Sequence, residues 1–186
     1  MKKIIALTFI VLSYAGYSQE EGVVEATKKG NLFFEVGTSV FGETALKHGN
    51  STGFSLLSSE GTTIYSIGAE GGYFVQDNTA IKVGLGYSDI DFSSFFTYKF
   101  GIKHYAGGNV PLQIDITGAT NEDQESFGGG SIDTPDPLWL GVQMGYAAFL
   151  SDNITFEPTI RYNSSLNSDF TSENLLEFKF NFVIFF

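Results

Sequence analysis

The sequence has no cysteine, which excludes a disulfide framework and any metal site built on thiolates. It also excludes a lipid-anchored lipoprotein, because that modification needs a cysteine at the new N-terminus. Charged residues make up only 17% of the chain, and the 10 basic residues face 21 acidic ones. Binding to nucleic-acid phosphates depends on Lys and Arg, so we expect no nucleic acid among the partners of this chain.

The sequence also lacks an apolar run of the ~20 residues that a membrane-spanning helix needs. The one clear apolar run, residues 4–12, follows two lysines and precedes small residues around Gly16 and Ser18. This order is typical of a cleaved signal peptide. We predict a signal peptide over residues 1–18, a short polar lead-in over residues 19–30, and a single domain over residues 31–186.

Apolar and polar residues alternate in several segments of this domain, and such alternation predicts β-strands. Most of the segments are about as long as the ~9–11 residues of a tilted membrane strand, and the mean soluble strand is shorter, at ~5–6 residues. We predict eight strands: Asn31–Phe41, Thr63–Val75, Thr79–Tyr87, Phe95–Tyr105, Leu112–Thr120, Leu138–Phe149, Ile154–Tyr162 and Leu175–Phe186. The expected fold class is all-β, an eight-stranded antiparallel up-and-down transmembrane β-barrel.

The connections between these strands alternate in length. Tight turns follow the second, fourth and sixth strands, and Asp-Asn supplies two of them because both side chains bond local backbone. Mostly longer loops follow the other strands, at residues 42–62, 88–94, 121–137 and 163–174. Short turns at one end and long loops at the other are the arrangement of outer-membrane barrels, with both chain ends on the periplasmic side.

Each strand presents one apolar and one polar face, because successive side chains point to opposite sides. A soluble barrel or sandwich would show the same alternation with the apolar face turned inward. The polar face is rich in glycine, which weakens a solvated strand but leaves room for long side chains in a narrow barrel. Aromatic residues gather near strand ends, as in interfacial girdles, with Tyr87, Phe96, Trp139 and Tyr162 towards the long loops. These features favour an apolar face that is turned outward to lipid.

Ten charged residues lie on the polar face, five acidic and five basic. They are Glu35, Glu70, Lys82, Lys99, Lys103, Asp115, Glu157, Arg161, Glu177 and Lys179. Such a balance suits an enclosed space, where an unpaired charge costs several kcal/mol. We therefore favour a closed network of ion pairs and hydrogen bonds with a structural role over an open channel, although the pairings cannot be assigned without the strand register.

The last strand carries outward aromatic residues up to the end of the sequence. Its apolar face includes Phe178, Phe180, Phe182, Ile184 and Phe186. In this strand and in its hairpin pattern, the chain resembles the small outer-membrane β-barrel domain family of the OmpA and OmpX type, over roughly Leu32–Phe186. The hairpins that end in Asp-Asn are similar to those of Bacteroidota members.

The resemblance implies that the terminal strand is read by the barrel-assembly machinery and that outer-membrane lipids and lipopolysaccharide surround the protein. The family includes structural barrels, adhesins and a few lipid-modifying enzymes, so the resemblance leaves the activity open. We expect an outer-membrane location.

The long loops are acidic, with only Lys47 opposing their carboxylates. The densest stretch contains Glu122, Asp123 and Glu125, whose oxygens are the kind of ligand that Ca²⁺ prefers. It lacks an EF-hand pattern, so solvation and mutual repulsion are the alternative reading. An extracellular ligand of these loops cannot be named from the sequence.

An enzyme would need a nucleophile and a base within reach of each other. His48, in the first long loop, and His104, near a short turn, are the two histidines. Neither sits convincingly beside a serine at the lipid-facing outer rim. We therefore expect no enzymatic activity and no cofactor, and a structural or surface-interaction role for a closed barrel. The alternatives are a narrow pore or small-solute-binding barrel, and a lipid A-modifying hydrolase.

Overall fold

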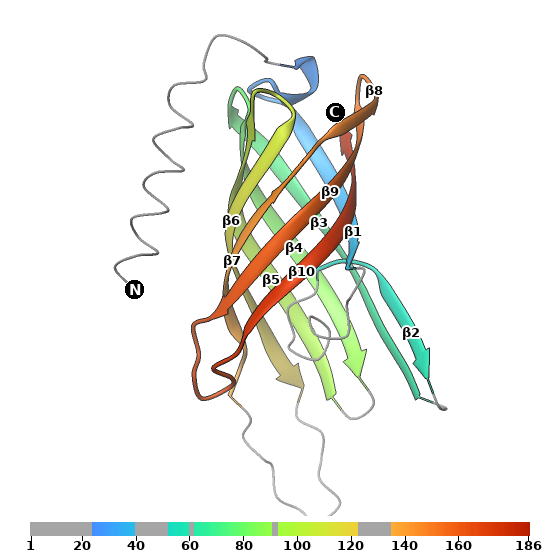
Figure 1. Cartoon of the computed structure of the whole chain (residues 1–186), viewed down its shortest axis with the longest axis vertical. Helices are drawn as coiled ribbons and strands as arrows, with labels where there is room; N and C mark the ends of the chain where they lie inside the picture. The colour runs from blue at the N-terminus through green and yellow to red at the C-terminus, as the bar shows by residue number, and fades with distance from the viewer. Residues whose placement is uncertain (1–23, 40–51, 60–61, 91–92, 123–134) are drawn as a thin grey trace, which may run out of the picture.

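The computed structural model describes residues 24–39, 52–59, 62–90, 93–122 and 135–186, and almost all of these residues belong to one curved antiparallel sheet (Figure 1). A single 3-10 turn, η1 (Glu25–Thr27), precedes it. The strands are β1 (Leu32–Ser39), β2 (Ser55–Ser59), β3 (Thr62–Gln76), β4 (Thr79–Ile90), β5 (Ser93–Ala106), β6 (Val110–Glu122), β7 (Leu138–Gly145), β8 (Ala148–Ser151), β9 (Ile154–Ser165) and β10 (Asn174–Phe185).

The sheet closes on itself as a barrel. Neighbouring strands pair in the order β1-β10-β9-β7-β6-β5-β4-β3, and β3 pairs with β1 to complete the ring. β7 and β8 both pair with β9 and together make one strand of the wall, so the described residues form eight wall strands. β2 lies outside the ring and pairs with β3. This confirms the predicted eight-stranded antiparallel barrel.

The division of the sixth predicted strand into β7 and β8 has a local cause. Pro158 lies on the neighbouring strand β9 and has no N–H to donate to a backbone hydrogen bond between the strands. Tyr146 N still donates to Pro158 O (3.2 Å), but Ala147 N donates to Asn109 O (2.8 Å), in the β5–β6 turn, and not to β9. The strand therefore breaks at Tyr146 and Ala147 and resumes at Ala148.

The prediction of a long loop over residues 88–94 is wrong. β4 continues to Ile90 and β5 begins at Ser93, so two residues connect them. The polar run that suggested a loop includes Ser88, which is fully buried on the inner face of β4. The predicted tight turns are confirmed, and Asn78 has the left-handed φ (60°) expected of a turn Asn, whereas Asn153 does not.

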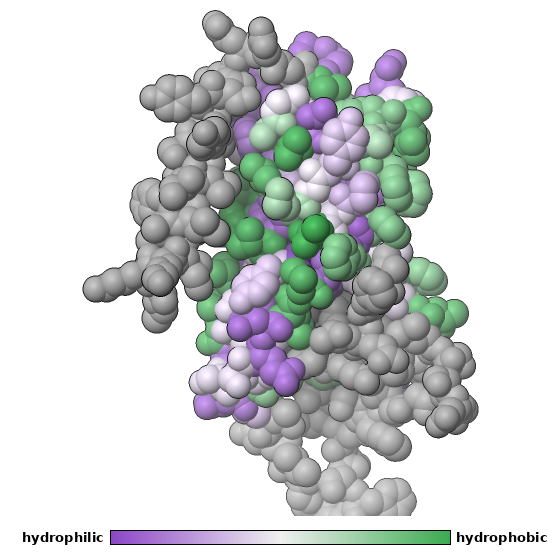
Figure 2. Space-filling view, in the orientation of Figure 1, coloured by the Kyte–Doolittle hydropathy of each residue, from purple (hydrophilic) through white to green (hydrophobic). Residues whose placement is uncertain are grey.

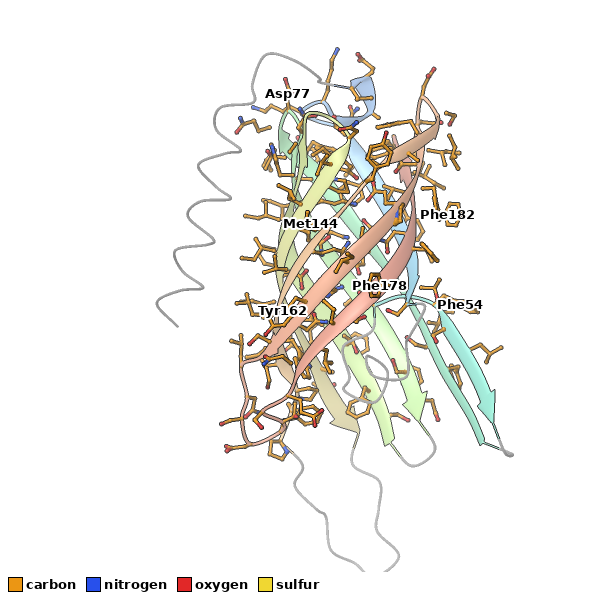
Figure 3. All side chains as sticks on the ribbon, viewed as in Figure 1. Phe54, Asp77, Met144, Tyr162, Phe178 and Phe182 are labelled. Atoms are coloured by element: carbon orange, nitrogen blue, oxygen red, sulfur yellow. The ribbon has the colours of Figure 1, made fainter. Side chains whose placement is uncertain are left out.

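The apolar face of the wall is its outer face. In β10 every second residue is buried. The exposed residues after Asn174 are all apolar: Leu176, Phe178, Phe180, Phe182 and Ile184, with Phe186 following. Figure 2 shows apolar side chains over much of the visible wall, and Phe178, Phe182 and Met144 lie around it in Figure 3. This is the arrangement of a transmembrane barrel and the reverse of a soluble one. We call this outer surface the apolar belt.

In the described part of the chain, no helix has the length and hydropathy to cross a membrane. The predicted signal peptide lies outside the described residues.

Candidate functional site in the barrel lumen

The ten charged residues of the polar face all lie inside the barrel. Each is at most 7% exposed, because alternation along the strands turns these side chains inward and the closed wall shields them. They come from seven strands: β1, β3, β4, β5, β6, β9 and β10. The lumen therefore contains five carboxylates and five cations in a space from which bulk water is excluded, and such charges need partners.

Lys82 joins two carboxylates that face each other across the β1–β3 seam. Glu35 and Glu70 are directly opposite in the strand register, where like charges repel. The Lys82 ammonium lies 2.7 Å from Glu35 Oε2 and 2.7 Å from Glu70 Oε2. Glu70 Oε1 is in turn 2.7 Å from Lys99 Nζ and 3.9 Å from Lys179 Nζ. The repulsion between the two glutamates is thus offset by lysines on three other strands.

Lys103 extends this group across the lumen. Its ammonium lies 2.8 Å from Glu35 Oε2 and 2.6 Å from Glu157 Oε2, so that it connects β1 to β9. The other oxygen of Glu157 accepts hydrogen bonds from the Tyr105 hydroxyl (2.8 Å) and the Thr155 hydroxyl (3.0 Å). Both oxygens of this fully buried carboxylate are therefore satisfied.

Arg161 and Asp115 form a bidentate ion pair. Arg161 Nη1 and Nη2 each lie 2.6 Å from one oxygen of Asp115, a geometry that only a planar guanidinium provides. Gln113 donates to Asp115 Oδ2 (2.6 Å) and accepts from Lys82 Nζ (2.9 Å), which joins this pair to the lysine–glutamate group.

The remaining acidic residue, Glu177, is attached through Asn163. Arg161 Nε donates to Asn163 Oδ1 (2.7 Å), the Asn163 amide donates to Glu177, and the Ser39 hydroxyl donates to Glu177 Oε2 (2.9 Å). All ten charged residues thus belong to one continuous polar network of balanced charge, which we call the lumen network.

Glycines on the inner face make room for this network, as the sequence pattern predicted. An added methyl group at Gly84 would lie 2.9 Å from Glu70 Cγ and 3.3 Å from Lys99 Cβ. A methyl group at Gly141 would overlap the guanidinium of Arg161. The long side chains occupy the space that these glycines leave empty.

A methyl group at Gly141 should therefore be destabilising. We expect Gly141→Ala to lower the free energy of unfolding by roughly 1–3 kcal/mol, because Arg161 is held by both oxygens of Asp115 and cannot move freely. Gly71→Ala is the matched control, since its methyl group would meet only the Phe33 carbonyl oxygen, at 3.5 Å. Urea unfolding of both variants in phospholipid vesicles tests this, and equal stabilities would contradict it.

An aromatic cluster inside the barrel, which the sequence analysis missed, lies next to the network at the short-turn end. Phe33, Phe74, Tyr105 and Phe185 are at most 3% exposed, and their ring centroids lie 5.7–6.2 Å from one another in the contacting pairs. Lys103 Nζ lies 5.4 Å and 5.0 Å from the ring centroids of Phe33 and Tyr105. A signal exists in the sequence, because alternation fails near this end of four strands, at Phe33-Phe34, Tyr73-Phe74, His104-Tyr105 and Phe185-Phe186.

Part of the predicted polar lead-in covers the same end of the barrel. Thr27 is fully buried, and its hydroxyl donates to Asn78 Oδ1 (2.5 Å), while Asn78 N donates to Thr27 O (2.8 Å). Gly30 N donates to Phe74 O (2.9 Å). Ala26 packs against the aromatic cluster. η1 therefore lies against the turn between β3 and β4 and against the cluster (Figure 1).

Other predicted residues lie away from the network. The prediction that Trp139 belongs to an outer girdle is wrong. Trp139 is fully buried on the same face of β7 as the inward Gly141, and its ring lies edge-on to the ring of Phe170. His104 lies between the inward Lys103 and Tyr105, and its Nδ1 is 2.9 Å from the Thr79 hydroxyl.

The predicted cation ligands fall mostly beyond the described residues. Glu122 is the last residue of β6, and Asp123, Glu125, His48 and Lys47 lie outside the described residues. In the described ranges, no three His, Cys, Asp or Glu side chains are grouped as a metal site. The calcium site therefore stays a prediction.

No protein-family model matches the chain, and no curated protein does. Solved structures do. The outer membrane protein Ail of Yersinia pestis, in a phospholipid bilayer nanodisc, is 10% identical with a TM-score of 0.50, covering 85% of this chain and 100% of Ail. The N-terminal β-barrel domain of Pseudomonas aeruginosa OprF is 10% identical with a TM-score of 0.51, covering 85% of this chain and 98% of that domain. The likeness concerns the fold.

Proposed function

We propose that this chain, which has the fold of the small eight-stranded outer-membrane barrels, is an integral protein of the bacterial outer membrane with a closed lumen and no enzymatic activity. On this proposal the apolar belt faces lipid, the short turns and η1 face the periplasm, and the long loops face the exterior. The protein stabilises the envelope or presents its acidic loops to a partner.

The lumen network is the observation that carries this proposal. A conducting pore needs a continuous column of water, whereas the lumen network connects its charged side chains across the barrel by ion pairs and hydrogen bonds. The aromatic cluster and the residues around η1 add a second, apolar layer at the periplasmic end. These two layers support a lumen that is closed to hydrated solutes.

The exterior rim is where a partner would bind. The residues that the structure describes at the long-loop end include exposed acidic ones, among them Asp136, Asp169 and Glu173. In the described ranges, Lys28 and Lys29 are the cations outside the lumen. Lys28 pairs with Glu25 of η1, and Lys29 N donates to Asp77 in the short turn between β3 and β4. Lys47 is the single basic residue of the long loops, and the described part of the rim has no Lys or Arg that could bind lipopolysaccharide phosphates directly. We therefore propose that divalent cations bridge the carboxylates of the rim to these phosphates.

Recording from the refolded protein in planar bilayers tests the closed lumen. We expect no steady single-channel openings in KCl at either polarity, and no swelling of proteoliposomes in solutions of small sugars. Heat-modifiable gel migration establishes that the protein in the sample has folded. Steady openings from the folded protein would reject the closed barrel in favour of a narrow pore.

A further inference from the structure

The seam between β1 and β3 is closed by strand pairing over only part of its length. The two strands pair over four residues, from Leu32 opposite Tyr73 to Glu35 opposite Glu70. On its other side, β1 stays paired with β10 as far as Ser39. β3 pairs with β2 only over Thr62–Ser66, so Ile67–Ala69 pair with neither β1 nor β2 on this side. A wall that faces lipid must satisfy its backbone polar groups internally, so this part of the seam needs another partner.

Residues Thr52–Leu56, which we call the seam segment, provide that partner. Phe54 N donates to Gly37 O of β1 (2.7 Å), and the Ser66 hydroxyl of β3 donates to Gly53 O (3.1 Å). A side chain on Gly53 would overlap the Gly37 carbonyl, so the two backbones meet at a pair of glycines. The segment thus contacts both strands where they no longer pair with each other.

The inner end of the seam segment is attached to the lumen network. Thr52 is 1% exposed, and its hydroxyl donates to the Glu70 carboxylate. Gly68 permits this approach, since a methyl group there would lie 2.7 Å from the Thr52 carbonyl carbon. The segment is therefore held from inside the barrel as well as from both edges of the seam.

The outer side of the seam segment is apolar and continues the belt. Phe54 is 54% exposed and Leu56 is 63% exposed, and Leu56 pairs with Tyr65, an outward residue of β3. Gly37, to which Phe54 is bonded, pairs with Asn181 between two belt residues, Phe180 and Phe182. Figure 3 shows Phe54 at the wall where β2 leaves the barrel.

We propose that the seam segment is a membrane-embedded part of the wall whose outward side chains, Phe54 and Leu56, contact lipid acyl chains. This rests on the proposed insertion of the barrel into the outer membrane. The first long loop thus does not lie wholly outside the bilayer: where it returns to β3, it completes the lipid-facing surface between β1 and β3.

Site-directed spin labelling tests this directly, because the chain has no cysteine and each variant carries one label. The nitroxide is placed at Phe54→Cys, at Leu56→Cys, at Val142→Cys in the belt, and at Asp152→Cys in an exposed short turn. Collision with O₂, which enters lipid, is compared with collision with a water-soluble nickel chelate. We expect the O₂-to-nickel ratio at position 54 to be close to the ratio at position 142 and several-fold above the ratio at position 152. The ratio at position 56 should lie between the ratios at positions 54 and 152.

Two results would overturn the proposal in distinguishable ways. A water-like ratio at positions 54 and 56 beside a lipid-like ratio at 142 would reject the seam segment as lipid-facing while the barrel remains in the membrane. A water-like ratio at 142 as well would reject membrane insertion itself. Heat-modifiable migration of each labelled variant shows that the reading comes from the folded barrel, and position 56 gives the answer if Phe54→Cys does not fold.

Discussion

Replacing Arg161 by Met is expected to lower the free energy of unfolding by about 3–5 kcal/mol, the usual cost of removing one partner from a buried ion pair. The loss leaves Asp115, itself 3% exposed, with hydrogen bonds only from Gln113 and Thr117. It also leaves the lumen network with five carboxylates against four cations. Urea unfolding in phospholipid vesicles, followed by heat-modifiable gel migration, measures the change.

A second variant separates charge imbalance from lost packing. In Arg161→Met with Asp115→Asn the network is neutral again, so we expect this double variant to be more stable than Arg161→Met alone. Lys28→Met is the matched control for an exposed pair, because Lys28 and its partner Glu25 are 49% and 82% exposed. Its loss should not be measurable. If Arg161→Met and Lys28→Met were equally stable, the lumen would be filled with water.

Placing a charge on the apolar belt is the second large effect. Val142, which is 43% exposed, lies on the outer face of β7 between Ile114 of β6 and Tyr162 of β9. We expect Val142→Arg to lower the free energy of unfolding by ~2–4 kcal/mol, the cost of an arginine near the middle of the bilayer. The same unfolding experiment in vesicles measures it.

Leu150→Arg is the control at a different depth. Leu150 is 63% exposed in β8, one residue from the short turn that precedes β9. An arginine there should cost only ~0–1 kcal/mol, because it reaches the headgroups. A large loss at position 142 with little loss at 150 locates the hydrocarbon. Equal tolerance at both positions would mean that water surrounds the wall.

Alternation along the strands was sufficient to predict which charged residues face the lumen. It could not predict their partners, because pairing depends on the strand register and on side chains that cross the barrel. Lys103 and Glu157 are 54 residues apart in the sequence and lie on strands that are not neighbours. Only the closed wall brings their side chains within 2.6 Å.

The features that escaped prediction are those where alternation is locally ambiguous. Leu138-Trp139-Leu140 is apolar throughout, and the preference of aromatic residues for membrane interfaces predicts the wrong direction for Trp139. Alternation places Phe186 outward and Phe185 inward, as observed. It does not show that Phe33, Phe74 and Tyr105, from three other strands, meet Phe185 inside the barrel. β2 was missed because a short serine-rich strand inside a long connection carries little periodic signal.

The spread of the lumen network over seven strands has a consequence for how the barrel is assembled. Glu35 near the beginning of the domain depends on Lys82 and Lys103, and Lys103 depends on Glu157, far later in the chain. A partly formed sheet would expose unpaired ammonium and carboxylate groups to hydrocarbon. Intermediates in which only some of the strands are paired should therefore not accumulate. Insertion and ring closure should therefore occur as a single cooperative event.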